Sequence, residues 1–187
     1  MMGNPAGSPK KEDGKQGLHS RKGLVPHKNN EGTYLLLLEL EKNQKVKPGK
    51  LKEADYKKGV YIYVGRAKRG LKARIRRHTR REKKSFWHID YLLRKAKIIE
   101  VWTRENYFGE CQTASRIRQF LPASSSVHKG FGSSDCRCPG HLLPVSSSKR
   151  EVRLLLRKMG FHKAGALTGP IPSVRPSSSW CEGREMS

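Results

Sequence analysis

The chain has 187 residues and a formal net charge of +24, from 40 Lys and Arg residues against 16 Asp and Glu residues. This length suits one compact domain with a modest core. So large a positive charge favours a nucleic acid as the partner over an anionic membrane surface. The longest apolar run, Leu35 to Leu38, is far shorter than the roughly 20 residues of a membrane-spanning helix, so we expect no membrane partner.

The two ends of the chain have compositions typical of segments without a packed core. Residues 1–30 lack hydrophobic periodicity, so we expect a disordered basic arm that carries no secretory signal. Residues 31–145 are expected to form the globular domain. Residues 146–187 predict a basic amphipathic helix and then a disordered Ser/Pro-rich tail. The four cysteines show no disulfide-framework spacing, which favours a reducing cytoplasm.

The first half of the domain predicts two strands separated by a polar insertion. Residues 32–41, GTYLLLLELE, form a continuous apolar run bounded by turn residues and charges, which indicates a buried strand. Residues 60–65, VYIYVG, predict a second strand, and adjacent runs of this kind favour antiparallel pairing. Residues 42–59 contain a Pro-Gly turn signal and are expected to form a loop or an exposed hairpin.

Helices and strands then alternate. Residues 71–78 predict a helix in which Leu71 and Ile75 face the sheet, while Arg74 and His78 lie along the edge of that face. Residues 85–97 predict a second helix, with Ser85 as N-cap and Trp87, Tyr91 and Leu92 as its apolar stripe. The remaining elements are a strand at 97–103, a helix at 109–121 and a turn-rich loop leading to a short apolar strand within 130–145. This order predicts an α/β fold with a small central antiparallel or mixed sheet of three or more strands, flanked by helices.

Basic residues are concentrated between Arg66 and Lys84, where eleven Arg or Lys stand beside one acid, Glu82. Such a run can be a solvated helix face, but in a chain this cationic it favours contact with nucleic acid. If six of these residues neutralise phosphates, log K should fall against log salt with a slope of roughly −5 on duplex DNA. The candidates for nucleic-acid binding are Arg66, Lys68, Arg69, Lys72, Arg77 and Arg81.

Gly-x-Tyr on the first strand, Tyr-x-Gly ending the second, and an Arg and a His on the following helix form an ordered set of motifs. They are GTY (32–34), YVG (63–65), Arg74 and His78, with Glu110 at the start of a later helix. This order resembles the GIY-YIG nuclease superfamily. The stretches RIRRH, WHIDYLL and GFGSSDCRCPGHL sharpen the match, over about residues 31–145, to an uncharacterised GIY-YIG-related family found alone or fused to endonuclease III-type DNA glycosylases.

The resemblance implies a GIY-YIG-like fold and a metal-dependent DNA endonuclease that hydrolyses phosphodiester bonds in DNA repair or processing. It implies that Tyr34 and Tyr63 are the motif tyrosines, one of which helps to deprotonate the attacking water. Arg74 would polarise the scissile phosphate, with His78 near the catalytic tyrosine, and Glu110 would hold one Mg²⁺ or Mn²⁺ ion. The expected partners are DNA and a DNA glycosylase or other repair protein, and we expect a monomer.

Several alternatives stay open at this point. Twenty-eight residues separate Tyr34 from Tyr63, more than is usual in the superfamily, which an inserted hairpin would explain. Tyr61 lies on the same strand face as Tyr63 and competes for its role. A phenol is a poor base at neutral pH, and we expect cations such as Arg74 and Arg66 to lower its pKa. The rival function is a non-catalytic nucleic-acid-binding module, whereas RNA binding is disfavoured because no exposed aromatic platform is evident.

A second constellation offers soft metal ligands. Cys111, Cys136, Cys138 and His141 could form a Zn²⁺ site, although the Cys-x-Cys spacing is tighter than usual and buried structural thiols are the alternative. Asp135, on a Gly-rich turn, is either a turn former or part of the cleft. We expect His88 and Asp90 to cap the second helix or to support the site.

Overall fold

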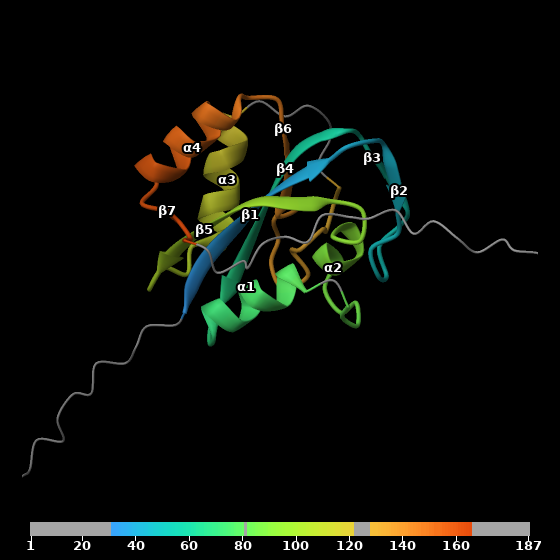
Figure 1. Cartoon of the computed structure of the whole chain (residues 1–187), viewed down its shortest axis with the longest axis horizontal. Coiled ribbons are helices and arrows are strands. Elements are labelled where there is room, and N and C mark those ends of the chain that lie inside the picture. The colour runs from blue at the N-terminus through green and yellow to red at the C-terminus, as the bar shows by residue number, and fades with distance from the viewer. Residues whose placement is uncertain (1–30, 81, 122–127, 166–187) are drawn as a thin grey trace, which may run out of the picture.

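The computed structural model describes residues 31–80, 82–121 and 128–165, so both expected disordered segments lie largely outside the described residues (Figure 1). A five-stranded sheet has the order β6-β4-β1-β5-β7, and every neighbouring pair is antiparallel. Four helices flank it, so the predicted α/β class is confirmed. Within the described ranges, no helix is long and apolar enough to cross a membrane. The strands of this sheet are β1 (Gly32–Leu40), β4 (Gly59–Ala67), β5 (Lys97–Glu105), β6 (Leu142–Val145) and β7 (His162–Lys163).

The central strand, β1, is buried on both faces. Tyr34, Leu36 and Leu38 belong to a core cluster on one face of the sheet, which we call the first core and the first face. Leu35 and Leu37 belong to a second core on the opposite, second face. Successive side chains of a strand point to opposite faces, so helices on both sides of the sheet require an uninterrupted apolar run in this strand. The LLLL stretch is therefore apolar throughout because helices cover this strand on both faces of the sheet.

The polar insertion between the two motif strands forms a separate hairpin, as expected. Strands β2 (Gln44–Val46) and β3 (Ala54–Tyr56) pair with each other in a two-stranded sheet. Val46 and Tyr56 are buried and join the first core cluster. The additional residues between Tyr34 and Tyr63 are thus accommodated without changing the pairing of β1 with β4.

Helix α1 (Leu71–Thr79) packs on the first face of the sheet. Leu71, Ile75 and His78 are its buried residues, so the expectation that His78 lies at the edge of the packed face is wrong. The spacing i, i+4, i+7 places all three on one side of the helix. Gly70, in the left-handed conformation with φ 66°, turns the chain from the end of β4 into this helix.

Helix α2 (His88–Leu92) is shorter than predicted and begins three residues after Ser85. The backbone N–H groups of Phe86 and Trp87 donate to Asp90 Oδ2, at 3.1 and 3.0 Å. Because Asp90 reaches back to these amides, the helix starts after Trp87, and the predicted Ser85 N-cap is wrong. The expected capping role of Asp90 is confirmed. The buried apolar side chains of α2 are Ile89 and Leu92, whereas Trp87 and Tyr91 are only partly buried.

The second face is covered by α3 (Glu110–Phe120) and α4 (Lys149–Lys158), which lie on the opposite side of the sheet from α1 and α2 (Figure 1). Strand β7 then pairs with β5. The globular domain therefore continues past residue 145, where we expected it to end. The buried residues that join these elements are Ala114, Ile117, Leu121, Val152, Leu156, Met159 and Phe161.

A buried carboxylate on β5 holds the C-terminal elements to the sheet. Glu100 accepts hydrogen bonds from Trp102 Nε1 at 2.9 Å and from Arg153 Nε at 2.8 Å. Lys163 Nζ lies 3.2 Å from the same carboxylate. Burial opposes ionisation of Glu100, but these donors outweigh it and lower its pKa. One residue thus anchors both α4 and β7.

Replacing Phe161 with alanine is expected to destabilise the whole domain by about 3–5 kcal/mol, because this side chain is only 1% exposed in the second core. The control is Leu154→Ala on α4, where the side chain is 54% exposed and the expected change is under about 0.5 kcal/mol. Urea unfolding followed by circular dichroism measures both. Equal, small effects would mean that residues 146–165 do not share the core.

Candidate active site

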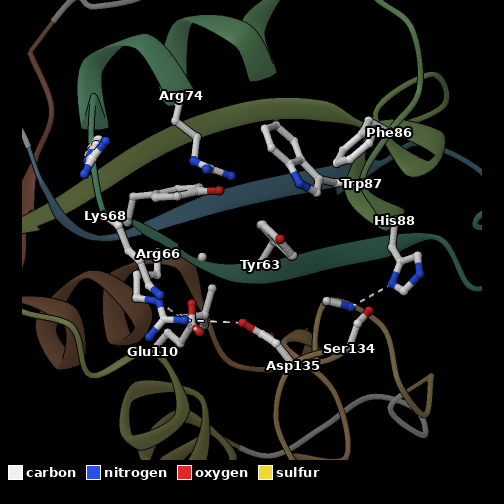
Figure 2. A pocket seen from close by; sticks show the side chains of 15 residues that line it. Tyr63, Arg66, Lys68, Arg74, Phe86, Trp87, His88, Glu110, Ser134 and Asp135 are labelled. Atoms are coloured by element: carbon white, nitrogen blue, oxygen red, sulfur yellow. Dashed lines mark hydrogen bonds and ion pairs between the residues drawn. The ribbon is translucent and has the colours of Figure 1, made fainter.

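A cleft of about 770 Å³ opens on the first face of the sheet, where β1 begins and β4 ends. Figure 2 shows Arg74 extending into it from α1, with Glu110 and Arg66 on the opposite wall. Four of the five predicted catalytic residues, Tyr34, Tyr63, Arg74 and Glu110, line this cleft, as do the predicted nucleic-acid-binding residues Arg66, Lys68 and Arg69.

The glycine of the Tyr-x-Gly motif makes room for the Tyr34 side chain. Tyr34 on β1 pairs directly with Gly65 on β4. A Cβ atom at position 65 would lie 2.4 Å from Tyr34 Cζ and 2.5 Å from its hydroxyl oxygen. Because the Tyr34 ring is only 1% exposed, it has no free space into which to move. Gly65 therefore lets the ring lie across β4 with its hydroxyl at the cleft.

His78 lies behind Tyr34 and does not itself line the cleft. The Tyr34 hydroxyl is 2.8 Å from His78 Nε2. Burial, with smaller contributions from neighbouring cations such as Lys83, lowers the pKa of His78 to about 3, so its imidazole is neutral. His78 Nδ1 faces Asp90 Oδ1 at 3.9 Å. A proton on Nδ1 is favoured by that carboxylate, which leaves Nε2 to accept a hydrogen bond from the tyrosine.

Both motif phenols are protonated in the free protein at neutral pH. Burial raises the pKa of Tyr34 and of Tyr63 well above the usual value near 10. Arg74 acts in the opposite direction on both groups, but burial outweighs it. The expectation that nearby cations lower the phenol pKa is therefore wrong. Removing a proton from Tyr34 requires an adjacent acceptor, and His78 Nε2 occupies that position.

Asp90 organises the rear of the site. It receives two hydrogen bonds from Arg77, Nη1 to Oδ1 at 3.0 Å and Nη2 to Oδ2 at 2.9 Å, while Lys83 Nζ lies 3.3 Å from Oδ1. Burial opposes its ionisation, but Arg77 and the backbone amides lower the pKa of Asp90 to about 2. Arg77, a predicted nucleic-acid contact, thus has an internal partner and positions the carboxylate behind His78.

Two carboxylates flank Arg66 on the far wall of the cleft. Arg66 Nε lies 3.5 Å from Glu110 Oε1, and Arg66 Nη2 lies 3.3 Å from Asp135 Oδ2 (Figure 2). Burial raises the pKa of Glu110, outweighing Arg66, and the Asp135 charge acts in the same direction. A nearby cation favours the ionised form of a carboxyl group whose pKa is raised in this way. Asp135 lies in a turn and also lines the cleft, so the structure agrees with both roles considered for it.

Aromatic side chains form a further wall that sequence reasoning missed. Trp87, predicted to be core, lies between two guanidinium groups, with Arg74 Cζ 4.4 Å and Arg77 Cζ 4.1 Å from its ring centroid. Phe86 beside it is 77% exposed and lines the same cleft (Figure 2). An exposed aromatic surface is therefore present, contrary to expectation. The signal that could have found it is Asp90, because a cap at this position leaves Phe86 and Trp87 outside the helix.

The other candidates take different positions. The Tyr61 hydroxyl donates to the Lys57 carbonyl at 2.7 Å, and Tyr63 rather than Tyr61 lines the cleft. Lys72 is exposed on α1 and does not line the cleft. The prediction for Arg81 lies outside the described residues. The residues considered for zinc, Cys111, Cys136, Cys138 and His141, come together with their ligand atoms within 4.8 Å of one another.

The fold and the cleft define a small α/β domain whose cationic pocket is lined by paired tyrosines and two carboxylates, with a neutral histidine behind one tyrosine. The chain belongs to the family described as domain of unknown function DUF123, which matches residues 33–162. The matched range includes α4 and the start of β7, in agreement with their packing on the sheet. No curated protein and no solved structure matches the sequence.

Proposed function

We propose that this protein is a divalent-metal-dependent DNA endonuclease of the GIY-YIG type. The observation that supports this proposal is the meeting of four side chains from four elements at one cleft, with His78 of α1 directly behind Tyr34. The four are Tyr34 from β1, Tyr63 from β4, Arg74 from α1 and Glu110 from α3. The resemblance to domains fused to endonuclease III-type glycosylases suggests DNA repair or processing as the context, and a glycosylase or other repair protein as a partner.

The cationic wall would bind the phosphate backbone. Arg74 is restrained by the Trp87 ring, so its guanidinium fork is pre-oriented for the oxygens of a phosphate and loses less side-chain entropy on binding. Lys68 and Arg69 are exposed at the cleft and would contact flanking phosphates as sequence-independent charges. These residues fix the position of the DNA without specifying a base sequence.

The proton of the attacking water would leave through Tyr34. As the water oxygen bonds to phosphorus, its proton passes to the Tyr34 oxygen while the tyrosine proton passes to His78 Nε2, 2.8 Å away. The P–O bond to the leaving nucleotide breaks, and that oxygen carries away the electron pair. Negative phosphate charge in the cleft raises the proton affinity of His78. The resulting imidazolium faces the Asp90 carboxylate across 3.9 Å.

The donor set also fits a hard divalent cation. Glu110 supplies a carboxylate with a raised pKa on the cleft wall, and Asp135 supplies a second carboxylate that contacts the same Arg66 guanidinium group. Mg²⁺ and Mn²⁺ are commonly bound by one or two carboxylates together with water and substrate phosphate. Such an ion would supply Lewis-acid stabilisation of the leaving oxygen.

A plasmid-nicking assay tests this function. Supercoiled plasmid and branched or flapped DNA are incubated with full-length protein and Mg²⁺, Mn²⁺ or EDTA. Wild-type protein is expected to cut only with metal, and Glu110→Gln is expected to lose at least about 10²-fold in rate while binding DNA in EDTA as wild type does. The matched control is Glu105→Gln, an exposed glutamate at the end of β5.

The same assay distinguishes the endonuclease from the rival function, a non-catalytic nucleic-acid-binding module. Exposed Phe86 beside a cationic wall also suits a non-catalytic module, since base stacking on aromatic rings supports binding of single-stranded or splayed nucleic acid. In that case the wild-type protein binds DNA without cutting it under any metal condition. Equal nicking by wild type and Glu110→Gln would likewise contradict the endonuclease proposal.

A further inference from the structure

We propose that Cys111, Cys136, Cys138 and His141 bind one structural Zn²⁺ ion that joins the start of α3 to the loop at residues 131–141. Three soft thiolates and an imidazole are a common ligand set for structural zinc. The proposal does not depend on the endonuclease function, because it concerns a second site with different ligand chemistry.

The positions of the ligand atoms match such a site before any metal is bound. The three sulfurs and the histidine nitrogen lie within 4.8 Å of one another, and Cys136 Sγ is 3.6 Å from His141 Nε2. Tetrahedral coordination with Zn–S near 2.3 Å and Zn–N near 2.0 Å requires ligand atoms separated by roughly 3.5–3.8 Å. Small side-chain adjustments would close the shell, and no backbone rearrangement is required.

The backbone of the loop holds these ligands in place. Gly130 N–H donates to the Pro139 carbonyl at 2.8 Å, and His141 N–H donates to the Phe131 carbonyl at 2.7 Å. Arg118 of α3 donates to the Gly140 carbonyl at 2.8 Å. The loop is thus closed on itself and tied to the helix that carries Cys111.

His141 is oriented as a metal-binding histidine usually is. Its side chain is buried, at 1% exposure. One ring nitrogen faces Cys136, while the ring also hydrogen-bonds with the backbone of Gly132. Zinc-bound histidines commonly donate their second N–H to a carbonyl or carboxylate, which fixes the tautomer.

The tight Cys-x-Cys spacing, which argued against zinc in the sequence, does not prevent convergence. Arg137 between the two cysteines is exposed, whereas Cys136 and Cys138 are both half-buried and turn toward the cluster. The remaining ligands arrive from His141, further along the same loop, and from Cys111 on α3. Ligands from two separate elements give the ion a cross-linking role.

The location of the cluster suggests what the cross-link does. Cys111 directly follows Glu110, and Cys136 directly follows Asp135. Both carboxylates contact the Arg66 guanidinium group, Glu110 at Nε and Asp135 at Nη2. A zinc ion bound by Cys111 and Cys136 would fix the distance between the two carboxylates. It would also fix the position of the loop at residues 131–141 relative to the cleft.

Metal analysis of full-length protein, purified under reducing conditions without chelator, tests this inference. Elemental analysis is expected to give about one zinc per chain, and Co²⁺ exchange to give the thiolate-to-cobalt charge-transfer and intense d–d bands of a tetrahedral site. The double variant Cys136→Ser/Cys138→Ser is expected to lose the zinc. Arg137→Ala, the matched control between them, and Glu110→Gln are expected to retain it.

Two results would overturn the proposal. The first is that the wild-type protein contains no stoichiometric metal and takes up no added zinc in competition with a chromogenic chelator. The second is zinc content that is unchanged in the double variant. If that variant misfolds, the wild type decides: thiol-blocking reagent must release its zinc, and chelator must lower its melting temperature. Retention of zinc after thiol blocking would exclude these ligands.

Discussion

Replacing Arg74 with alanine is expected to slow DNA cleavage at saturating DNA by about 10²- to 10³-fold, the loss that follows removal of one preorganised donor at a developing charge. The guanidinium lies against the Trp87 ring at 4.4 Å and acts to lower the pKa of both motif tyrosines, although burial outweighs it. In the proposed reaction the guanidinium would therefore stand where negative charge builds up as water attacks the phosphate. Single-turnover nicking rates measure the effect.

Two further variants separate this role from simple attraction to DNA. Arg74→Lys keeps the charge but lacks the planar fork, so its rate should fall between those of wild type and Arg74→Ala. Arg76→Ala removes an exposed cation from the same helix and should leave the single-turnover rate within a few-fold of wild type. If Arg76→Ala and Arg74→Ala slow cleavage equally, Arg74 contributes only to overall binding.

The wild-type domain is expected to lose stability steeply on acidification, and His78→Gln is expected to lose less. His78 has a usual pKa of 6.5 but one of about 3 in the folded protein, chiefly because of burial. Between these values the unfolded chain binds the extra proton, so stability falls as the pH falls. From about pH 7 to about pH 4 this single group should cost on the order of 3 kcal/mol.

Urea unfolding at a series of pH values measures the difference between the two proteins. His88, His128 and His141 also have lowered pKa values because of burial, but they are present in both proteins and cancel. The folded pKa of Asp90 is about 2, so its contribution is lost mainly below this window. Parallel stability curves would show that His78 is not buried as a neutral group.

The sequence predicted strands β1, β4, β5 and β6 from local apolar patterns, and most of the cleft from the order of its motifs. The Leu-rich run of β1 and the helical spacing of Leu71 and Ile75 are apparent from neighbouring residues alone. Tyr34, Tyr63 and Arg74 were placed by motif order, and the cleft brings them together. Strand pairing between the two motifs is then enough to bring them into one site.

The features that sequence reasoning missed depend on tertiary contacts. The start of α2 is decided by Asp90 reaching back to two amides. The end of the domain is decided by the long-range pairing of β7 with β5, in which Lys163 pairs with Trp102. The raised pKa of each motif phenol reflects burial by side chains of other elements, such as His78 beside Tyr34 and Phe131 beside Tyr63. Residue type alone gave the charges around these groups but not their solvent exposure.

Helix α3 has a position with a consequence for engineering this protein. Its buried residues Ala114 and Ile117 pack in the second core, yet its first residue, Glu110, reaches the cleft on the first face. Among the described helices, α4 shares that core but contributes nothing to the cleft lining. Redesign of α4 should therefore change the thermal stability and leave the proposed activity intact. Repacking beneath α3 would move the Glu110 carboxylate and should change both the thermal stability and the proposed activity.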